Sequence, residues 1–545
     1  MSGATFYGQE NEFDYIVVGA GSAGCVVANR LSTHANLRVA LVEAGPSDRG
    51  PLLRQLTRVP LGMLALMKST RTNWGDTLSD TAPALRSVPS PRGRIAGGTS
   101  AINGMVYMRG HPDDYDAWVR MGNPGWNHTD VLQAFIRHED FEEGPGPAHG
   151  QGGELRVERL KDLNPLSRAF LAAASEAGYP GNHDFNSGQV EGFGVHHLTM
   201  TNGERLTSAR AFLHPIRHRA NLVTFFNTLV ERLTLSGSQV TGVEICQGEQ
   251  KRTLRARREV ILCGGAFNSP QLLMLSGIGE PSELLSLGLR VQHALPGVGK
   301  NYQDHACAPL IVRERGHASP ALTSTGWATM AAMPWRYWRH RRGLMAESVI
   351  QCGGFINLPG NKTGSPDLKF EFMPVLRPFG SMIPREHGFI IFVTLLHPSS
   401  RGRLRLRSRS PADRPQIEPA FFSDATDLAS VVEGLRIARQ IIDQPAMAGM
   451  CESELLPGVG VQSDTELAQH VLTRFGTTFH PVGTCKMGPA SDPLAVVDAR
   501  LRVHGLGGLR VADVSIMPRI VCANTNAPAM MIGERAAHFV LEGAP

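Results

Sequence analysis

The first regular pattern of apolar residues lies close to the N-terminus. Residues Phe13–Gly19 form a short apolar run rich in β-branched side chains, which is typical of a buried parallel strand. Glycines follow at once, and a helical pattern carried by Val26, Val27 and Leu31 leads into a second apolar run at Arg38–Glu43. Strand, helix and strand within about 30 residues predict a βαβ unit.

The rest of the chain leaves this pattern and returns to it. Residues 46–115 are rich in Gly, Pro, Arg and Ser with little periodicity, so we predict long ordered loops that lie against a ligand. The pattern predicts strands at Leu222–Leu235, Val240–Gln247, Glu259–Leu262, Phe389–Leu396, Gly402–Leu406 and Leu509–Ala512, and helices at Asp427–Gln444 and Ala529–Leu541. A final strand and helix indicate an interrupted domain, which places a ligand site where two domains meet.

Length, charge and cysteine usage narrow the class of protein. A chain of 545 residues exceeds the usual size of one hydrophobic core, which favours two domains. The net charge of +5 is mild for this length and no basic tail is present, so a nucleic-acid partner is not expected. The eight cysteines show neither CxxC pairs nor zinc spacing, which predicts buried reduced thiols and no metal site.

Membrane-related signals are weak in this sequence. The N-terminus is polar, and no run reaches the roughly 18–20 apolar residues that span a bilayer, so we expect a cytoplasmic protein. Trp335–Arg342, however, places three aromatic residues among four arginines. This segment predicts either a solvated helix packed on its domain or peripheral contact with the inner face of the cell membrane. The sequence indicates no oligomeric state.

A glycine-rich turn joins the first strand to the first helix. In the GxGxxG of Gly19, Gly21 and Gly24, the first glycine permits the tight turn, the second lets the backbone approach a pyrophosphate and the third allows close packing. Free N–H groups at the helix N-terminus face the phosphates. Glu43 ends the second strand, where a carboxylate accepts hydrogen bonds from ribose and repels the 2′-phosphate of NADP. These features predict a dinucleotide without choosing between NAD and FAD.

Longer motifs make that choice. They read PRGRIAGGTSAINGMVYMRGHPDDYD at 91–116, GAFNSPQLLMLSGIG at 265–279, HPVGTCKMG at 480–488, VVD at 496–498, RVADVSIMP at 510–518 and ANTNAPAMMIGERAA at 523–537. With the N-terminal fingerprint, they resemble the glucose–methanol–choline (GMC) oxidoreductase family, in order from Phe13 to Val540. The likeness is greatest to its choline dehydrogenase and aliphatic alcohol dehydrogenase branch, which implies an FAD-dependent enzyme acting on an alcohol.

The same resemblance implies the architecture. We expect an α/β protein, α+β overall, in which a Rossmann-like FAD-binding domain carries an inserted substrate-binding domain built on an antiparallel sheet. The FAD-binding domain would comprise residues 1–160, 221–312 and 479–545, the last of which returns with the catalytic residues. The substrate-binding domain would comprise residues 161–220 and 313–478.

The resemblance also assigns the contacts with the cofactor. Beyond Gly19, Gly21, Gly24 and Glu43, the expected FAD-binding residues are Ser22, Ala23, Ala44, Trp74, Arg94, Gly97, Gly98, Asn103, Gly104, Met105, Val106, Val230, Gly264, Asp513, Val514, Asn524, Thr525 and Asn526. Ile102 stands where some members carry a histidine joined covalently to the flavin, and isoleucine has no nucleophile. The expected cofactor is therefore non-covalent FAD. Ala96 replaces the larger aliphatic residue usual in the first signature, which should affect packing alone.

The expected reaction converts a primary alcohol to its aldehyde, with the hydroxyl proton going to a base and the α-hydride to flavin N5. A positioned base contributes about 10²–10⁴-fold. His480 matches the family's catalytic histidine, and Asn524 matches its partner position, which is histidine or asparagine. Because asparagine cannot act as a base, His480 should carry that role alone, while Asn524 holds the substrate oxygen. Electrons should pass to a quinone or another acceptor.

Other activities share these motifs. An alcohol oxidase would return the electrons to oxygen as hydrogen peroxide, a hydroxynitrile lyase would use FAD structurally, and a fatty-acid photodecarboxylase would need a cation to hold its carboxylate. Glu371, in PDLKFEFMP at 366–374, counts against the last. A choline-type substrate would need a carboxylate, for which Glu347 and Glu371 are candidates. We favour an apolar pocket for a medium-chain or aromatic primary alcohol.

Three further histidines receive weaker predictions. His196 and His197 are adjacent, so an extended backbone would turn them to opposite sides, and we expect exposed or core positions rather than a pocket. If His480 is not the base, they are the next to test. His305, in NYQDH, is expected to make structural hydrogen bonds.

Overall fold

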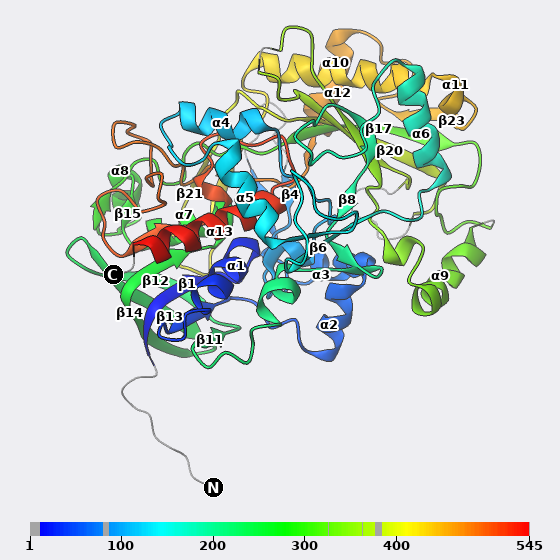
Figure 1. Ribbon diagram of the computed structural model, residues 1–545. Helices are drawn as coiled ribbons and strands as arrows, with labels where there is room; N and C mark the ends of the chain where they lie inside the picture. Colours follow the sequence, from blue (N-terminus) through cyan, green and yellow to red (C-terminus); the bar gives the residue numbers. More distant parts are fainter. Residues whose placement is uncertain (1–10, 80–86, 325, 362, 377–383, 544–545) are drawn as a thin grey trace.

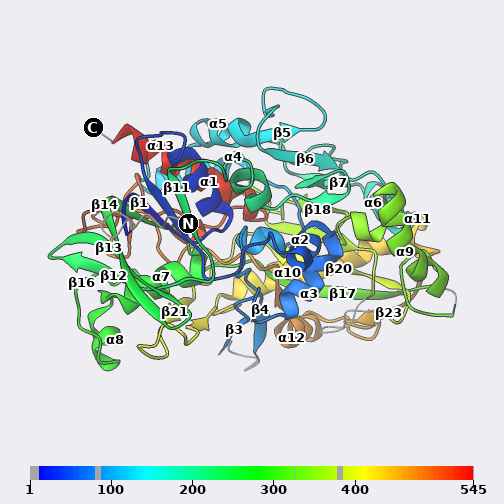
Figure 2. The same cartoon turned by 90° about the horizontal axis from the view of Figure 1, so that it is seen from below.

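The computed structural model describes residues 11–79, 87–324, 326–361, 363–376 and 384–543. Two seven-stranded sheets lie toward opposite ends of the molecule, as both views in Figures 1 and 2 show. One sheet is largely parallel and the other is antiparallel. The mixed α/β architecture expected from the sequence is thereby confirmed.

The first sheet is built on the two strands predicted near the N-terminus. Its order is β11-β2-β1-β14-β13-β12, and β25 also pairs with β14. The strands are β1 (Glu12–Val18), β2 (Val39–Val42), β11 (Leu222–Phe225), β12 (Leu229–Ser236), β13 (Gln239–Gln247), β14 (Gln250–Leu262) and β25 (Leu509–Val511). All four residues of β2 are buried, as parallel strands covered on both faces require. β14 begins nine residues before the predicted Glu259, because its exposed first half pairs with β13 as an antiparallel hairpin.

Helices from opposite ends of the chain pack together beside this sheet. α1 (Ser22–Leu31) follows β1, and α13 (Asn526–Glu542) crosses it (Figure 1). A Cβ at Gly533 of α13 would lie only 2.7 Å from the carbonyl oxygen of Ala23, so glycine permits the close approach. Arg30 and Glu534 add a buried ion pair with 2.7 Å between Nη2 and Oε1. The C-terminal segment is therefore fastened to the N-terminal βαβ unit.

The second sheet is antiparallel and positions the other side of the site. Its order is β23-β17-β20-β19-β18-β7, and β24 also pairs with β17. The strands are β7 (Gly192–Val195), β17 (Ala306–Glu314), β18 (Cys352–Ile356), β19 (Leu368–Met373), β20 (Gly388–Leu395), β23 (Cys451–Leu456) and β24 (Gly476–Thr477). α6 (Pro165–Glu176) and α10 (Ala425–Ile442) cover one face, where a Cβ at Gly434 would lie 2.4 Å from Val393.

Successive side chains of β19 face the protein core and a cavity in turn. Leu368 lies against α10 beside Gly434, and the ring of Phe372 stacks on Phe170 of α6 at 4.5 Å. Glu371 and Met373, at the intervening positions, line a cavity on the opposite face. Because successive side chains of a strand point to opposite faces, one apolar strand supplies both the core and the site.

The region 46–115 differs from the prediction of long loops. It contains α2 (Pro51–Arg58), α3 (Met63–Lys68) and the first residues of α4 (Pro112–Arg120). α2 and α4 each start with proline, which is tolerated at the first helical position because the N–H there has no partner within the helix. The loop prediction was therefore wrong for the helices at 51–58 and 63–68, for the short strands at 76–78 and 88–90 and for the start of α4. Pro and Gly around the two short helices masked their helical pattern.

The remaining elements lie outside these two sheets. The helices are α5 (His128–His138), α7 (Gly265–Leu275), α8 (Pro281–Ser286), α9 (Trp327–His340), α11 (Pro445–Ala448) and α12 (Asp464–Arg474). The short strands are β3 (Asp76–Leu78), β4 (Val88–Ser90), β5 (Glu139–Phe141), β6 (Leu155–Arg159), β8 (His197–Leu198), β9 (Met200–Thr201), β10 (Glu204–Arg205), β15 (Ile278–Gly279), β16 (His293–Ala294), β21 (Arg403–Arg405) and β22 (Gln416–Glu418). None of the helices in the described ranges combines the length and the apolar character that crossing a bilayer requires. The domain boundaries stay a proposal, and the one at residue 312 falls inside β17.

Candidate active site

A cavity of about 710 Å³ lies where the two sheets meet, and it is lined by residues from both. Most of the predicted site residues line it, namely Gly19, Gly21, Ser22, Ala23, Glu43, Ala44, Trp74, Gly98, Asn103, Gly104, Met105, Val106, Val230, Gly264, His480, Asp513, Val514, Asn524, Thr525 and Asn526. Gly24, Arg94 and Gly97 are not among the lining residues. A Cβ at Gly24 would lie 1.9 Å from the carbonyl oxygen of Gly19, so this glycine serves packing.

One end of the cavity is shaped by backbone. α1 begins after Gly21 without a side-chain cap, which leaves its first N–H groups for a ligand. A Cβ built at Gly21 would have only the Cys263 carbonyl oxygen near it, at 4.0 Å, whereas one at Gly98 would lie 2.8 Å from the Cα atom of Gly21. Gly98 also has a φ of +54°. Two facing glycines and a helix N-terminus fit a pyrophosphate.

Two buried carboxylates stand beside this end. Glu43 accepts hydrogen bonds from the backbone N–H groups of Ala20 at 2.9 Å and Gly45 at 2.8 Å, and burial raises its pKa to about 7. Asp513 accepts from the N–H of Gly265 at 2.8 Å and the hydroxyl of Ser269 at 2.6 Å. These bonds fix both carboxylates at the cavity wall, where hydroxyl groups of a nucleotide would meet them.

The opposite end contains His480, held on a strained turn after β24. Phe479 adopts a left-handed backbone with φ of +65°, which is uncommon for a bulky residue. Asp304 stabilises the turn, because its Oδ1 accepts the backbone N–H of His480 at 2.8 Å and its Oδ2 accepts the Thr477 hydroxyl at 2.6 Å. Burial raises the pKa of Asp304 to about 6. The aspartate thus aims the histidine into the cavity.

The contacts of the His480 ring define which nitrogen carries the proton. Its Nε2 lies 3.2 Å from Nδ2 of Asn524, an atom that can only donate, so Nε2 accepts and bears a lone pair. Its proton therefore sits on Nδ1, which lies 3.0 Å from Nδ1 of His305 and 2.9 Å from the hydroxyl of Thr478. His480 thus presents a proton acceptor on the side of Asn524 and of the cavity.

Electrostatics keep this acceptor uncharged. Burial, and then the electrostatic influence of His305, Lys369 and Arg92, hold the pKa of His480 well below its ordinary value. Burial likewise lowers the pKa of His305 to about 3. Both rings are therefore neutral near neutral pH, which is the state a general base needs.

Asn524 has a partner that the sequence reasoning did not include. Its Oδ1 accepts a hydrogen bond from the ammonium of Lys369 at 2.7 Å, and the same ammonium meets Oε1 of Glu371 at 2.5 Å. Lys369 and Glu371 are spaced by two on β19, so the alternation of LKFEFM was the available signal for a shared face. The contact of His305 with His480 was also missed, since only the fold brings NYQDH to the turn that carries His480.

The other predicted candidates lie away from the cavity wall. His196 and His197 are buried, 0% and 1% exposed, and neither lines the cavity, which agrees with the core positions expected. Glu347 is buried beside Gln351, which donates to it at 3.2 Å, and burial raises its pKa to about 7. Of the two carboxylates considered for a choline-type substrate, only Glu371 lines the cavity.

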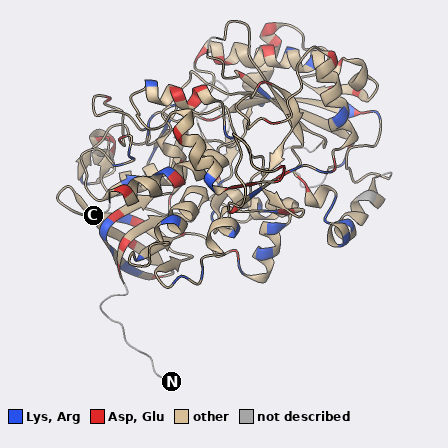
Figure 3. Cartoon of the chain, in the orientation of Figure 1, with Lys and Arg blue, Asp and Glu red and all other residues tan. Residues whose placement is uncertain are grey.

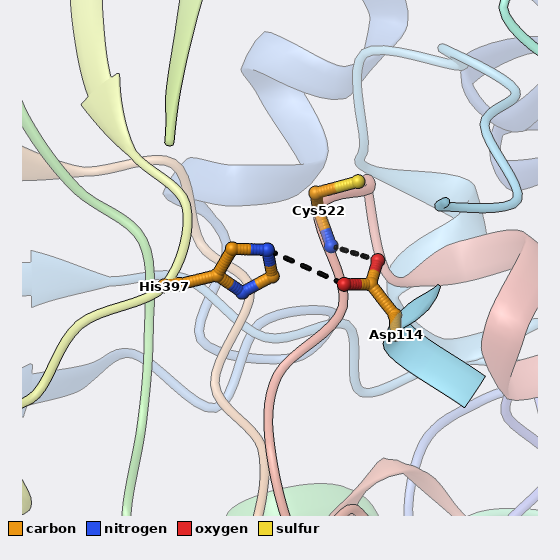
Figure 4. Close-up of side chains that lie close together, drawn as sticks. All are labelled: Asp114, His397 and Cys522. Atoms are coloured by element: carbon orange, nitrogen blue, oxygen red, sulfur yellow. Dashed lines mark hydrogen bonds and ion pairs between the residues drawn. The ribbon is translucent and has the colours of Figure 1, made fainter. Parts of the chain in front are cut away.

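A buried Asp–His–Cys cluster supports the loop that carries Asn524 (Figure 4). Oδ2 of Asp114 accepts the backbone N–H groups of Cys522 at 2.8 Å and His111 at 3.1 Å. Oδ1 accepts the Ser365 hydroxyl at 2.9 Å and lies 3.3 Å from Nε2 of His397. Because each carboxylate oxygen of Asp114 is already engaged twice, we interpret the cluster as an anchor between α4 and the loop that carries Asn524 rather than as a metal centre.

Comparison with known proteins places these features in a family. Models of the GMC oxidoreductase N- and C-terminal regions match residues 13–307 and 398–533. An alcohol dehydrogenase (acceptor) from Pseudomonas putida is 40% identical over 97% of this chain and 96% of its own length. The mitochondrial choline dehydrogenase of Mus musculus is 40% identical over 98% of this chain and 90% of its own. The crystal structure of pyridoxine 4-oxidase from Mesorbium loti, 31% identical, superposes with a TM-score of 0.87 over 98% of this chain and all of the other.

Proposed function

This chain belongs to the GMC oxidoreductase family, and on that premise we propose that it oxidises a primary alcohol to its aldehyde, with His480 as the base. It is an FAD-dependent oxidoreductase that acts on CH–OH donors. The observation that carries the proposal is the 3.2 Å contact between Nδ2 of Asn524 and Nε2 of His480 at one end of the cavity, which makes Nε2 the proton acceptor.

The chain's own residues divide the work between binding and proton transfer. Gly21 and the N-terminus of α1 would hold the FAD pyrophosphate, and Glu43 would meet the ribose. Bound FAD supplies the hydride acceptor, at its N5 atom. His480 Nε2 takes the hydroxyl proton, while the amide N–H of Asn524 donates to the substrate oxygen. The charge that His480 gains is shared with Thr478 and His305 through Nδ1.

The test is anaerobic mixing of the purified yellow protein with a panel of primary alcohols. A neutral medium-chain or aromatic alcohol should bleach the flavin and yield one aldehyde per flavin reduced. Retention of full colour with every alcohol would contradict the proposal and would favour a lyase in which FAD is structural.

The proposed attachment of FAD is non-covalent. Ile102 lines the cavity at the position where a covalent histidine would stand, and its side chain offers no nucleophile. Acid precipitation should therefore release all of the yellow colour into the supernatant. Colour retained in the denatured pellet would show a covalent bond elsewhere.

The proposed electron acceptor is a quinone or another small acceptor rather than oxygen. The naming of the Pseudomonas putida relative as an acceptor-dependent alcohol dehydrogenase supports this choice. Reduced enzyme should then be reoxidised much faster by a soluble quinone than by air. Rapid oxygen consumption with one peroxide per aldehyde would instead identify an oxidase.

We further propose that α9 rests on an anionic membrane surface. Trp327, Trp335 and Trp338 are 60%, 59% and 75% exposed and lie on one side of the helix at a spacing of eight and three residues. Exposed Arg336 and Arg339 flank them, and Figure 3 shows basic residues along this protruding helix. Tryptophan rings with flanking arginines fit the interface of a bilayer that carries negative charge.

Vesicle co-sedimentation tests the membrane proposal. The protein should bind vesicles that contain anionic lipid at low salt and bind them less at high salt. It should not bind vesicles of neutral lipid. A variant with Trp335→Ser, Trp338→Ser, Arg336→Gln and Arg339→Gln should lose this binding and keep its alcohol activity. Equal sedimentation of variant and wild type would contradict the role of α9.

A further inference from the structure

A buried lysine stands behind the catalytic amide. Lys369 is only 2% exposed and its ion-pair partner Glu371 only 3%. Both side chains project from β19 toward the cavity, which Glu371 lines, and the ammonium also lies 5.6 Å from the ring of Phe355. The two buried charges at the reacting end require an explanation, because burying a charge costs free energy unless that charge is paired and hydrogen-bonded.

The ammonium dictates how Asn524 is oriented. Lysine is a donor without any acceptor, so the amide atom that meets it at 2.7 Å must be Oδ1. The other end of the amide, Nδ2, is thereby turned toward Nε2 of His480. A reversed amide would bring an oxygen lone pair against the lone pair of the base. Lys369 therefore fixes the donor that the substrate oxygen needs.

The same ammonium neutralises the carboxylate that a cationic substrate would use. The acidic residues among the described lining of the cavity are Glu43, Asp76, Glu371 and Asp513. Glu43 and Asp513 are held by backbone N–H groups at the nucleotide end, and Asp76 faces the charges of Arg92 and Arg414. Glu371, with Oε1 on the lysine at 2.5 Å, has its charge compensated. A quaternary ammonium at this end would also meet the repulsion of Lys369.

We propose that Lys369 is a positioning and specificity-determining residue, which orients the Asn524 amide toward His480 and, by pairing with Glu371, selects neutral alcohols over choline-type cations. This inference rests on the proposed function and refines its substrate class. The inference predicts that this chain prefers neutral alcohols, although a protein 40% identical to it is named a choline dehydrogenase.

Two substitutions of Lys369 separate the two roles. Lys369→Met removes both the donor and the charge, whereas Lys369→Gln keeps an N–H donor and removes the charge. Flavin reduction by a neutral primary alcohol should slow about tenfold in Lys369→Met and less in Lys369→Gln, because only the second can still hold Asn524 Oδ1. In both, kcat/KM for choline relative to the neutral alcohol should rise about tenfold or more, because Glu371 is released.

The pH profile supplies a readout that mere loss of packing would not move. The groups that influence His480 are His305, Lys369 and Arg92. Removing the positive charge of Lys369 favours protonation of His480, so the apparent pKa seen in flavin reduction should rise in both lysine variants. The double variant Lys369→Met/Glu371→Gln should lose the gain toward choline.

A second arm covers the case in which the lysine variants fail to fold. Glu371→Gln leaves the ammonium unpaired, so a medium-chain carboxylate should become a competitive inhibitor that binds about tenfold more tightly than to wild type. Flavin absorbance changes on titration measure this binding. Unchanged carboxylate affinity, together with an unchanged choline ratio and pH profile in any folded lysine variant, would overturn the proposal. Failure of the proposed function is distinguishable, because in that case none of the alcohols tested would reduce the flavin of the wild-type enzyme.

Discussion

The two ends of the cavity are built by different means. The nucleotide end is made of backbone: a helix N-terminus, facing glycines and carboxylates held by N–H groups, most of it within a single βαβ unit. The reacting end is made of side chains that come from four distant segments, around residues 304, 369, 480 and 524.

This difference predicts which substitutions should lower the cofactor content and which should lower the rate of flavin reduction. Backbone at the nucleotide end has no room for a Cβ at particular glycines, so a single methyl group there should expel the cofactor. Side chains at the reacting end are linked by hydrogen bonds, so their loss should slow the reaction while FAD stays bound. Cofactor content and reduction rate should therefore respond independently.

The largest effect is expected from Gly19→Ala. A Cβ at Gly19 would lie 2.5 Å from the Cys263 carbonyl oxygen, and its φ of +102° disfavours any side chain. The purified variant should contain almost no flavin by absorbance. The matched control is Gly50→Ala, because Gly50 has an ordinary φ of −60° and a methyl group added there would have no atom within 4 Å. Full flavin in Gly19→Ala would remove the distinction between the two ends.

The next effect in size is expected from Asp304→Ala, which should lower the rate of flavin reduction and leave the FAD content unchanged. Loss of the carboxylate leaves the N–H of His480 and the hydroxyl of Thr477 without their acceptor, so the strained turn should relax. Flavin reduction should slow by about 10–100-fold, the scale of a misplaced general base, while FAD content stays normal. Rapid-mixing absorbance measures the rate, and Asp464→Asn, at a side chain 81% exposed, is the control. A variant that loses FAD but reduces its remaining flavin at the normal rate would show that Asp304 stabilises the fold rather than the position of His480.

A smaller slowing is expected in Asn524→Ala. The variant removes the donor to the substrate oxygen but leaves His480 in place, so reduction should slow about tenfold. Since asparagine does not titrate, the ionisation in the pH profile should persist. Disappearance of that ionisation in a pH series would show that Asn524 shapes the base itself.

The smallest effect on activity is expected from Glu534→Gln, which acts on stability. Burial raises the pKa of Glu534, but the influence of His138, with Nδ1 at 3.7 Å, and the hydrogen-bonded ion pair with Arg30 outweigh it and lower that pKa to about 2. A carboxyl with a depressed pKa stabilises the fold above its ordinary value of 4.5, and this stabilisation is lost as pH falls toward 2. Wild-type melting temperature should fall between about pH 5 and 2. The variant should lose about 3 kcal/mol at neutral pH, and its melting temperature should depend less on acid pH. Thermal melts that show the same fall of melting temperature with acid pH in both proteins would contradict the assignment.

The two ends also differ in how far the sequence predicts them. Apolar periodicity located β1, β2 and α13 to within three residues and placed the helix α1 directly after the glycine turn, because these elements are buried and their signals are local. His480 and Asn524 were identified through the family resemblance and not through spacing. Lys369 and His305 were not assigned to the site, since their partners lie 155 and 175 residues away.

The misses in the fold have the same origin. α2 and α3 were predicted as loops because prolines and glycines surround them and their support comes from neighbouring elements. The first half of β14 was missed because its exposed, charged residues show no apolar run. Where stability depends on contacts between distant segments, a local pattern carries little signal.

The most direct test of the central claim is the pH dependence of anaerobic flavin reduction in wild type and His480→Ala. In wild type the rate should stay on a plateau through neutral pH and fall only under acid conditions, because the pKa of His480 is held well below its ordinary value and the base must be neutral. His480→Ala should keep its FAD, reduce it at least about 10²-fold more slowly and lose that ionisation, with rescue by added small bases. A near-normal rate with the wild-type profile in His480→Ala would show that the base lies elsewhere.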